Sequence, residues 1–323
     1  MTRRTSYNIL VTGATGFIGS SLIPVLLSKG HRVIATDRFS NVKKTKLNNL
    51  FNCENFELVR LDLVNLDDLK KVVRKSDMIF HLAANVDVRK GYTNTNLDFL
   101  DNITATRNVL ECMRLSRSCK KVIFTSSSVV YGENPTMPTR ENYGPLKPIS
   151  LYAASKLACE SLISGYVGTF GIEAVIFRLA NVVGPNIKHG VIFDFIRKLK
   201  LSNGKYLEIL GDGKQKKSYL YIEDCINALI MGLNEFPSRL EIFNVGSDDQ
   251  IDTNTIAKTI IKQLGLQPRI GYSSKSKDGR GWIGDVKTML LSTDKLKQMG
   301  WRSKYSSKDS VSLTVKNMTG LSV

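Results

Sequence analysis

The chain has 323 residues, of which 42% are hydrophobic and 23% charged, an ordinary balance for a globular protein. No apolar run approaches the roughly 18 residues of a membrane span, and the first residues show no signal-peptide pattern, so we expect a cytoplasmic protein. The net charge of +17 comes from scattered Lys and Arg residues rather than a basic tail, which favours small anionic substrates over nucleic acid as partners.

Short apolar runs alternate with helical patterns along the first half of the chain. Buried strands rich in Val, Ile, Leu and Phe are predicted at residues 8–11, 32–36, 56–60, 78–80, 121–124 and 174–178. Helices are predicted over about 16–29 and 97–117, and from about 151 onward. Such alternation is typical of an α/β protein, here a Rossmann doubly wound parallel sheet. Beyond residue 178 the pattern becomes irregular, except for one more strand at 241–245.

A glycine-rich segment lies between the first strand and the first helix. Gly13, Gly16 and Gly19 are spaced G-x-x-G-x-x-G, which lets the chain turn sharply and brings N–H groups against a pyrophosphate. Three glycines alone are a weak signal, but their strand-turn-helix position indicates a dinucleotide site. We therefore expect a dinucleotide-binding domain at 1–178, to which about 218–248 returns, and a smaller α/β substrate domain at 179–323.

A carboxylate closes the second predicted strand. Asp37 lies 18 residues beyond Gly19, where it can accept hydrogen bonds from the adenosine ribose and would repel a 2′-phosphate. This favours NAD over NADP, although the adjacent Arg38 could neutralise such a phosphate. Asp62 and Leu63, after the third strand, either border the adenine or form an ordinary strand-end turn.

Two Tyr-x-x-x-Lys pairs occur in the chain. Tyr143 and Lys147 enclose Gly144 and Pro145, which break helices, whereas Tyr152 and Lys156 enclose good helix formers and share a helix face. A free tyrosine has a pKa of about 10, and bringing it near 7 requires about 4 kcal/mol. One close cation lowers a pKa by about 1–3 units, so Lys156 and a positively charged nicotinamide together can make Tyr152 a base.

Serine supplies the remaining polar group of this predicted catalytic set. Ser127 would hydrogen-bond the reacting oxygen and help to move its proton. The set suits hydride transfer at an alcohol carbon. The five cysteines form no C-x-x-C pair and the three histidines lack ligand spacing, so we expect neither a disulfide framework nor a metal site.

Longer motifs are similar to those of the extended short-chain dehydrogenase/reductase family, in particular its archaeal-type UDP-galactose (UDP-glucose) 4-epimerases. The resemblance covers nearly the whole chain, and its motifs are TGATGFIGS at 12–20, HLAANVDVR at 81–89, FTSSSVVYG at 124–132, YAASK at 152–156, RLANVVGPNIKHGVIFDFI at 178–196, GDGKQKKSYLYIED at 211–224 and GRGWIGDV at 279–286.

This resemblance implies reversible inversion at C4 of UDP-glucose and UDP-galactose, through a 4-keto sugar and tightly held NAD. It implies catalytic roles for Ser127, Tyr152 and Lys156. Beyond the glycines and carboxylates, the cofactor would meet Phe17, Ile18, Leu82, Ala83, Ala84 and Asn102. The nucleotide-sugar would meet Ser127, Asn181, His189, Gly190, Val191, Lys217, Tyr219 and Arg280. The resemblance also implies a homodimer, in which the helices near 97–117 and 151–168 would pair.

Several positions depart from the family pattern. Lys217 stands where many relatives have arginine, and Trp282 stands where many bacterial members have an arginine two residues before Gly-Asp; here Arg280 lies earlier. Related dehydratases and decarboxylases carry acids where this chain has Ser128 and Val129, so neither activity is expected. Met289 matches a position that helps to decide whether an N-acetyl group fits, and its flexible side chain predicts some tolerance for UDP-N-acetyl sugars.

Other functions share these residues. A nucleotide-sugar oxidoreductase with exchangeable cofactor would use the same catalytic set, and co-purification of the cofactor would distinguish the two. A non-catalytic NAD sensor is disfavoured by the intact hydroxyl, phenol and ammonium groups.

Overall fold

The computed structural model describes residues 6–38, 47–133, 136–273 and 278–320, and they form two compact units. Unit 1 comprises Met1–Ser126, Ala154–Phe177 and Leu229–Ile242, and unit 2 comprises Ser127–Ala153, Arg178–Ala228 and Phe243–Val323. Each unit is described separately below. No helix in the described parts is long and apolar enough to cross a membrane.

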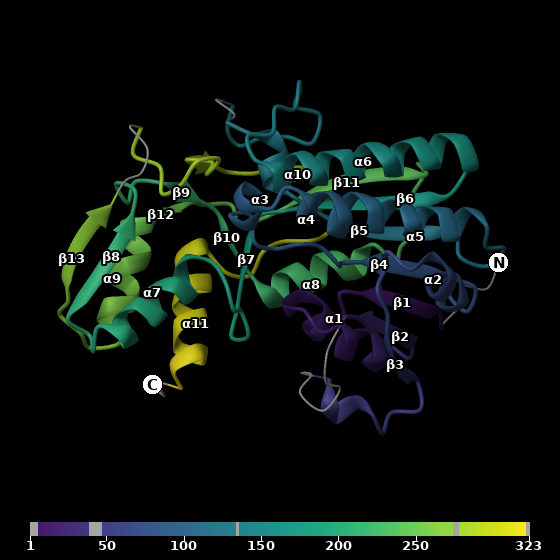
Figure 1. The fold of residues 1–323 in the computed structure, drawn as a ribbon, viewed down its shortest axis with the longest axis horizontal. Helices are drawn as coiled ribbons and strands as arrows, with labels where there is room; N and C mark the ends of the chain where they lie inside the picture. Colours follow the sequence, from purple (N-terminus) through teal and green to yellow (C-terminus); the bar gives the residue numbers. More distant parts are fainter. Residues whose placement is uncertain (1–5, 39–46, 134–135, 274–277, 321–323) are drawn as a thin grey trace. The chain divides into compact units, whose positions relative to one another are not determined.

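A seven-stranded parallel sheet dominates unit 1, in the order β11-β6-β5-β4-β1-β2-β3 (Figure 1). Its strands are β1 (Asn8–Thr12), β2 (Arg32–Asp37), β3 (Phe56–Arg60), β4 (Met78–His81), β5 (Lys121–Ser127), β6 (Glu173–Leu179) and β11 (Leu240–Val245). The predicted parallel sheet is therefore confirmed, and the run at 241–245 forms its edge strand beside β6. The sheet type and the edge strand both follow from continuous apolar runs in the sequence, because such runs suit strands that are covered on both faces.

Helices connect these strands. They are α1 (Phe17–Ser28), the short η2 (Asn48–Leu50), α2 (Leu66–Val73), α3 (Lys90–Thr93), α4 (Asn96–Asp98), η3 (Phe99–Thr104), α5 (Ala105–Arg114), η4 (Ser128–Tyr131) and α6 (Leu151–Phe170). The structure differs from the single helix that was predicted over 97–117. It is interrupted by the π-helical segment η3, and α5 ends at Arg114.

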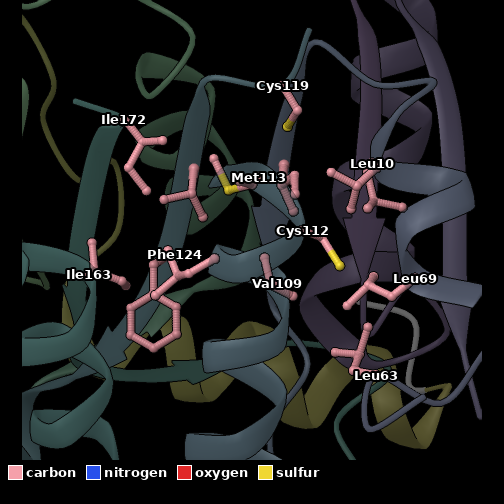
Figure 2. Close-up of a cluster of buried hydrophobic side chains, with 14 of the residues drawn as sticks. Leu10, Leu63, Leu69, Val109, Cys112, Met113, Cys119, Phe124, Ile163 and Ile172 are labelled. Carbon is pink, nitrogen blue, oxygen red and sulfur yellow. The ribbon is translucent and has the colours of Figure 1, made fainter. Parts of the chain in front are cut away.

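One buried apolar cluster joins α2, α5 and α6 to one face of the sheet. Figure 2 shows Leu69, Val109 and Ile163 from these helices beside Leu10 of β1 and Phe124 of β5. Successive strand residues point to opposite faces, so Ile9 and Val11, which are also fully buried, face the other side of the sheet. The sheet is thus covered by apolar side chains on both faces, and its polar residues collect at the strand ends.

Unit 2 contains three small sheets. The parallel pair β7 (Asn181–Val183) and β10 (Tyr219–Tyr221) forms one, the strands β12 (Ile251–Asp252), β9 (Lys216–Lys217) and β14 (Thr288–Met289) the second, and β13 (Arg269–Ser273) with β8 (Tyr206–Leu210) the third. Its helices are α7 (Val191–Leu201), α8 (Ile222–Met231), α9 (Thr253–Gln263), α10 (Asp294–Gln298) and α11 (Ser307–Thr319).

Candidate active site

The glycine loop of unit 1 is tightly packed. A Cβ on Gly13, whose φ is +67°, would lie 2.8 Å from the backbone of Ala83, and a Cβ on Gly19 would overlap the carbonyl oxygen of Gly13. Gly16 is the N-cap of α1 and gives the helix no side-chain cap. The loop therefore has room for backbone only, and the open helix start leaves N–H groups for an anion.

Asp37 is hydrogen-bonded to this loop. Its Oδ2 accepts from the backbone N–H of Thr15 at 2.9 Å and from the Thr15 hydroxyl at 2.6 Å, and Oδ1 accepts from the N–H of Arg38. Arg38, which made the choice between NAD and NADP ambiguous, donates two bonds of 2.9 Å to Asp101. Its charge is thereby neutralised within unit 1, which fits an unphosphorylated ribose.

The ends of β3 and β4 complete this edge of the sheet. Because β4, β1, β2 and β3 are neighbours, the segments that follow them lie beside the glycine loop. Thr12 accepts bonds from the N–H groups of Leu82 and Ala83. Buried Asn102 accepts from the N–H of Asn85, at 2.8 Å, and Asp62 and Leu63 follow β3. The expected cofactor residues of unit 1 are thus brought together, and their donors and acceptors fit a dinucleotide.

Lys156 lies on α6, one turn after Tyr152. Its side chain is only 3% exposed, and Nζ donates a 2.9 Å bond to the carbonyl oxygen of Thr125. The ammonium lies 4.7 Å from the centre of the Phe124 ring. Burial lowers the pKa of Lys156 to about 8, so the group remains mostly charged at neutral pH.

Ser127 ends β5 and caps the short helix η4 in unit 2. Its hydroxyl accepts a weak 3.5 Å bond from the N–H of Val129 and is half-buried. The following residue, Ser128, is buried. The other Tyr-x-x-x-Lys pair, Tyr143 and Lys147, lies in a non-helical segment, as predicted.

The residues expected to bind the nucleotide-sugar lie in unit 2. Tyr219 is paired with Asn181 across β10 and β7, and Lys217 precedes it by two residues. Asp285 joins two of the expected cations, because it accepts from Lys217 Nζ at 2.5 Å and, through its backbone oxygen, from Arg280 at 2.6 Å. Burial, with Asp285 nearby, raises the pKa of Tyr219, which therefore stays protonated.

The remaining residues of that set lie at the start of α7. His189 and Gly190 are exposed, and Gly190, with a φ of +85°, precedes the first turn of α7, which starts at Val191. Arg280 is further bonded to Asp278 and Glu133. Within the described residues, no group of three or more His, Cys, Asp or Glu could hold a metal ion.

Sequence reasoning missed a buried polar network behind the glycine loop. His81 bonds Thr12 through Nδ1 at 2.8 Å and Thr106 through Nε2 at 3.0 Å, and Thr106 donates to Cys159 on α6. Burial and the nearby Lys156 lower the pKa of His81 to about 3, so the ring is neutral. The position of His81 just before Leu82 could have indicated that it lies near the cofactor site, but nothing in the sequence indicated its hydrogen-bond partners.

Fold and site together define a dinucleotide-dependent enzyme with an extended Rossmann unit. The family model for the NAD dependent epimerase/dehydratase family matches residues 9–246, and the chain belongs to that family. The family is NAD-dependent, so NAD is the cofactor that the unit 1 residues fit. A putative UDP-glucose 4-epimerase of Methanocaldococcus jannaschii is 32% identical over 312 residues, covering 95% of this chain and 97% of the relative.

Solved structures agree with this assignment. A crystal structure of a UDP-galactose 4-epimerase has a TM-score of 0.84 and 36% identity, covering 97% of this chain and 99% of the other. UDP-glucuronic acid 4-epimerase from Bacillus cereus, in complex with UDP-glucuronic acid and NAD, has a TM-score of 0.86 and 27% identity over the same shares. The chain is therefore an enzyme of a family that includes nucleotide-sugar epimerases with different sugars.

Proposed function

We propose that the protein is a UDP-glucose/UDP-galactose 4-epimerase that inverts the sugar's C4 reversibly while NAD stays bound. The observation that carries this is the arrangement on α6, where Tyr152 precedes the buried, charged Lys156 by one turn, after a strand that ends at Ser127. Ser128 and Val129 supply no carboxylic acid for dehydration or decarboxylation. Relatives named for UDP-glucose and UDP-galactose match over nearly the whole chain.

The protein's own groups would manage the proton of the sugar 4-hydroxyl. Bound NAD would supply a reversible acceptor for the hydrogen at C4. Tyr152 would take the hydroxyl proton and later return it, Lys156 would favour the ionised phenol, and Ser127 would hold the reacting oxygen. A 4-keto sugar that turns in its site before reduction would account for inversion.

Unit 2 would bind the UDP part of the substrate. Asn181 and Tyr219 would contribute neutral hydrogen bonds, while Lys217 and Arg280 would contact the diphosphate. Lys217 already forms an ion pair with Asp285, and Arg280 donates to the backbone oxygen of the same residue, so binding a diphosphate would exchange these contacts for charge-assisted bonds to phosphate oxygens. His189, Gly190 and Val191, at the start of α7, would border the same nucleotide.

A second candidate is a related nucleotide-sugar oxidoreductase or epimerase with exchangeable cofactor. A solved relative at 27% identity is named for UDP-glucuronic acid, so another sugar is the specific alternative.

The deciding experiment is incubation of purified protein with UDP-galactose, without added cofactor, followed by separation of the UDP-hexoses. Conversion to UDP-glucose at steady state is expected. An enzyme that stays inactive, although folded and carrying NAD, would refute the proposed substrate. Activity that appears only with stoichiometric NAD or NADH, and consumes it, would favour the oxidoreductase.

We further propose that the protein is a homodimer. Unit 1 has a groove of about 550 Å³ along α6, lined by Ile103, Ala158, Ser161, Leu162, Gly165, Tyr166, Thr169 and Phe170. Phe170 is half-exposed at 49%, and Phe99 and Leu100 on η3 are exposed as well. Apolar surface on neighbouring helices suits a self-complementary contact. Light scattering is expected to give twice the mass of the 36.0 kDa chain.

The expected cytoplasmic location stays a prediction from sequence.

A further inference from the structure

The buried Lys156 ammonium needs compensation within unit 1. A desolvated cation is costly unless it is paired, and one hydrogen bond to Thr125 supplies only part of that compensation. The titratable groups that face it are Cys159 and Glu160 of α6, Asp98 of α4 and His81 of β4. His81 is neutral, and burial raises the pKa of the Cys159 thiol, which therefore stays protonated. The counter-charge must come from the two carboxylates.

Glu160 favours the charged lysine more strongly than Asp98 does, and it is also hydrogen-bonded to a neighbouring hydroxyl. Its Oε1 accepts a 2.5 Å bond from Ser126, at the end of β5. Asp98 differs in this respect. It is only 2% exposed, and among the described residues its Oδ2 has no hydrogen-bond partner, while Oδ1 accepts from Asn85 at 2.9 Å and Asn102 at 3.3 Å. A buried carboxylate oxygen without a donor persists only if a nearby positive charge favours it.

Hydrogen bonds connect Asp98 to the residue that precedes the lysine. The amide group of Asn102 that donates to Asp98 also donates a 2.7 Å bond to the hydroxyl of Ser155, the residue before Lys156. Asn102 lies in the π-helical segment η3, which follows α4 directly. The carboxylate is thereby fixed relative to the first turns of α6.

We propose that Asp98 is a counter-ion of Lys156, a positioning residue that keeps the lysine charged. The inference rests on the proposed catalytic roles of Tyr152 and Lys156. Asp98 touches neither substrate nor cofactor in this scheme, and it acts only through the lysine.

The electrostatics of the pair agree with this role. Burial raises the pKa of Asp98 and lowers that of Lys156, so each group alone tends toward its neutral form. Each also favours the charged form of the other. Asp101 has the opposite influence, because its negative charge raises the pKa of Asp98 further.

The test is the pH dependence of turnover in Asp98→Asn, which keeps the shape and removes the charge. Loss of this counter-ion is expected to lower the pKa of Lys156. The basic limb of the profile then moves down by about 1 pH unit, so the pH range of full turnover becomes narrower. Asp101→Asn is the matched control, since it removes an equal charge three residues away and is not expected to narrow the profile.

A readout without turnover separates this inference from the proposed function. With protein carrying ¹⁵N-labelled lysine, the Lys156 Nζ resonance is assigned by its loss in Lys156→Met and titrated with NAD bound. A lower titration midpoint in Asp98→Asn supports the counter-ion even if UDP-galactose is not a substrate. An unchanged midpoint, or an activity loss that is uniform across pH, overturns it.

If Asp98→Asn does not fold, Asn85→Ser serves instead. It removes a donor that lowers the pKa of Asp98, so a smaller shift in the same direction is expected. No shift in that variant would count against the proposal.

Discussion

The Nζ of Lys156 donates a 2.9 Å hydrogen bond to the carbonyl oxygen of Thr125, which ties helix α6 to the carboxyl end of strand β5. The contact fixes a buried cation two residues before the strand ends at Ser127. Sheet and helix thus hold a positive charge near the carboxyl end of β5. The fold sets the position of the Lys156 ammonium, and the nearby carboxylates of Glu160 and Asp98 favour its charged form.

Replacing Tyr152 by phenylalanine tests the proposed base. The change removes one oxygen, so turnover of UDP-galactose is expected to fall by about 10²- to 10⁴-fold while NAD remains bound. Tyr143→Phe is the matched control, since Tyr143 packs edge-on against Tyr131 outside any helix and should retain full turnover. Equal activity of the two variants would exclude Tyr152 as the base.

A pair of helical glycines tests the cofactor loop. Gly19→Ala is expected to abolish co-purified NAD, because the added methyl would overlap the Gly13 carbonyl oxygen and the backbone of Ala14. A methyl group added to Gly168 of α6 would meet no described neighbour within 4 Å, so Gly168→Ala should raise the free energy of unfolding by up to about 1 kcal/mol. Bound NAD is measured by absorbance after denaturation. Wild-type NAD content in Gly19→Ala would contradict the proposal that this glycine loop binds NAD.

Neutral His81 should make the fold sensitive to acid. Because its pKa falls from 6.5 to about 3, the unfolded chain binds a proton that the folded chain does not between these values. Stability from this group is therefore present above pH 6.5 and lost as pH falls, by about 2 kcal/mol between pH 6.5 and 5. Urea unfolding of His81→Gln should show less of this loss than the wild type.

His31→Gln is the control for that measurement. Burial lowers the pKa of His31 as well. Its ring accepts a hydrogen bond from the N–H of Tyr7 and is less deeply enclosed than that of His81, so His31→Gln should alter the acid-dependent loss of stability less. If His81→Gln loses stability with acid as steeply as the wild type, His81 is not the buried neutral group.

Met289 tests the breadth of sugars accepted. It is buried on β14, where its backbone is in register with Lys217 of β9. A flexible methionine predicts slow but measurable turnover of UDP-N-acetylglucosamine, increased in Met289→Gly with little effect on UDP-galactose. Absence of turnover in the wild type that appears in the variant would show that Met289 closes the pocket.

Much of unit 1 could be predicted from the sequence. Residues 8–11 and 121–124 are continuously apolar, and such runs are stable only as strands covered on both faces, so strand positions and sheet type followed. Gly13 and Asp37 were recognisable because backbone-only space and a strand-end carboxylate are properties of single residues. The structure shows Asp37 hydrogen-bonded to Thr15, two residues after Gly13 in the same loop.

The buried polar contacts could not be predicted. Asp98 lies in a polar stretch typical of a surface, and only the packing of η3 against α6 makes it a buried carboxylate. The π-helical turn at Phe99–Thr104 was not predicted either, since residues 97–117 have an ordinary helical pattern. Partners that are distant in sequence leave no local signal.

The most direct test of the account uses UDP-galactose that carries deuterium at C4, incubated with purified protein and no added cofactor. Transient transfer to bound NAD and return predicts UDP-glucose with the deuterium retained at C4. Loss of the deuterium to solvent, or no UDP-glucose from folded protein that carries NAD, would contradict it.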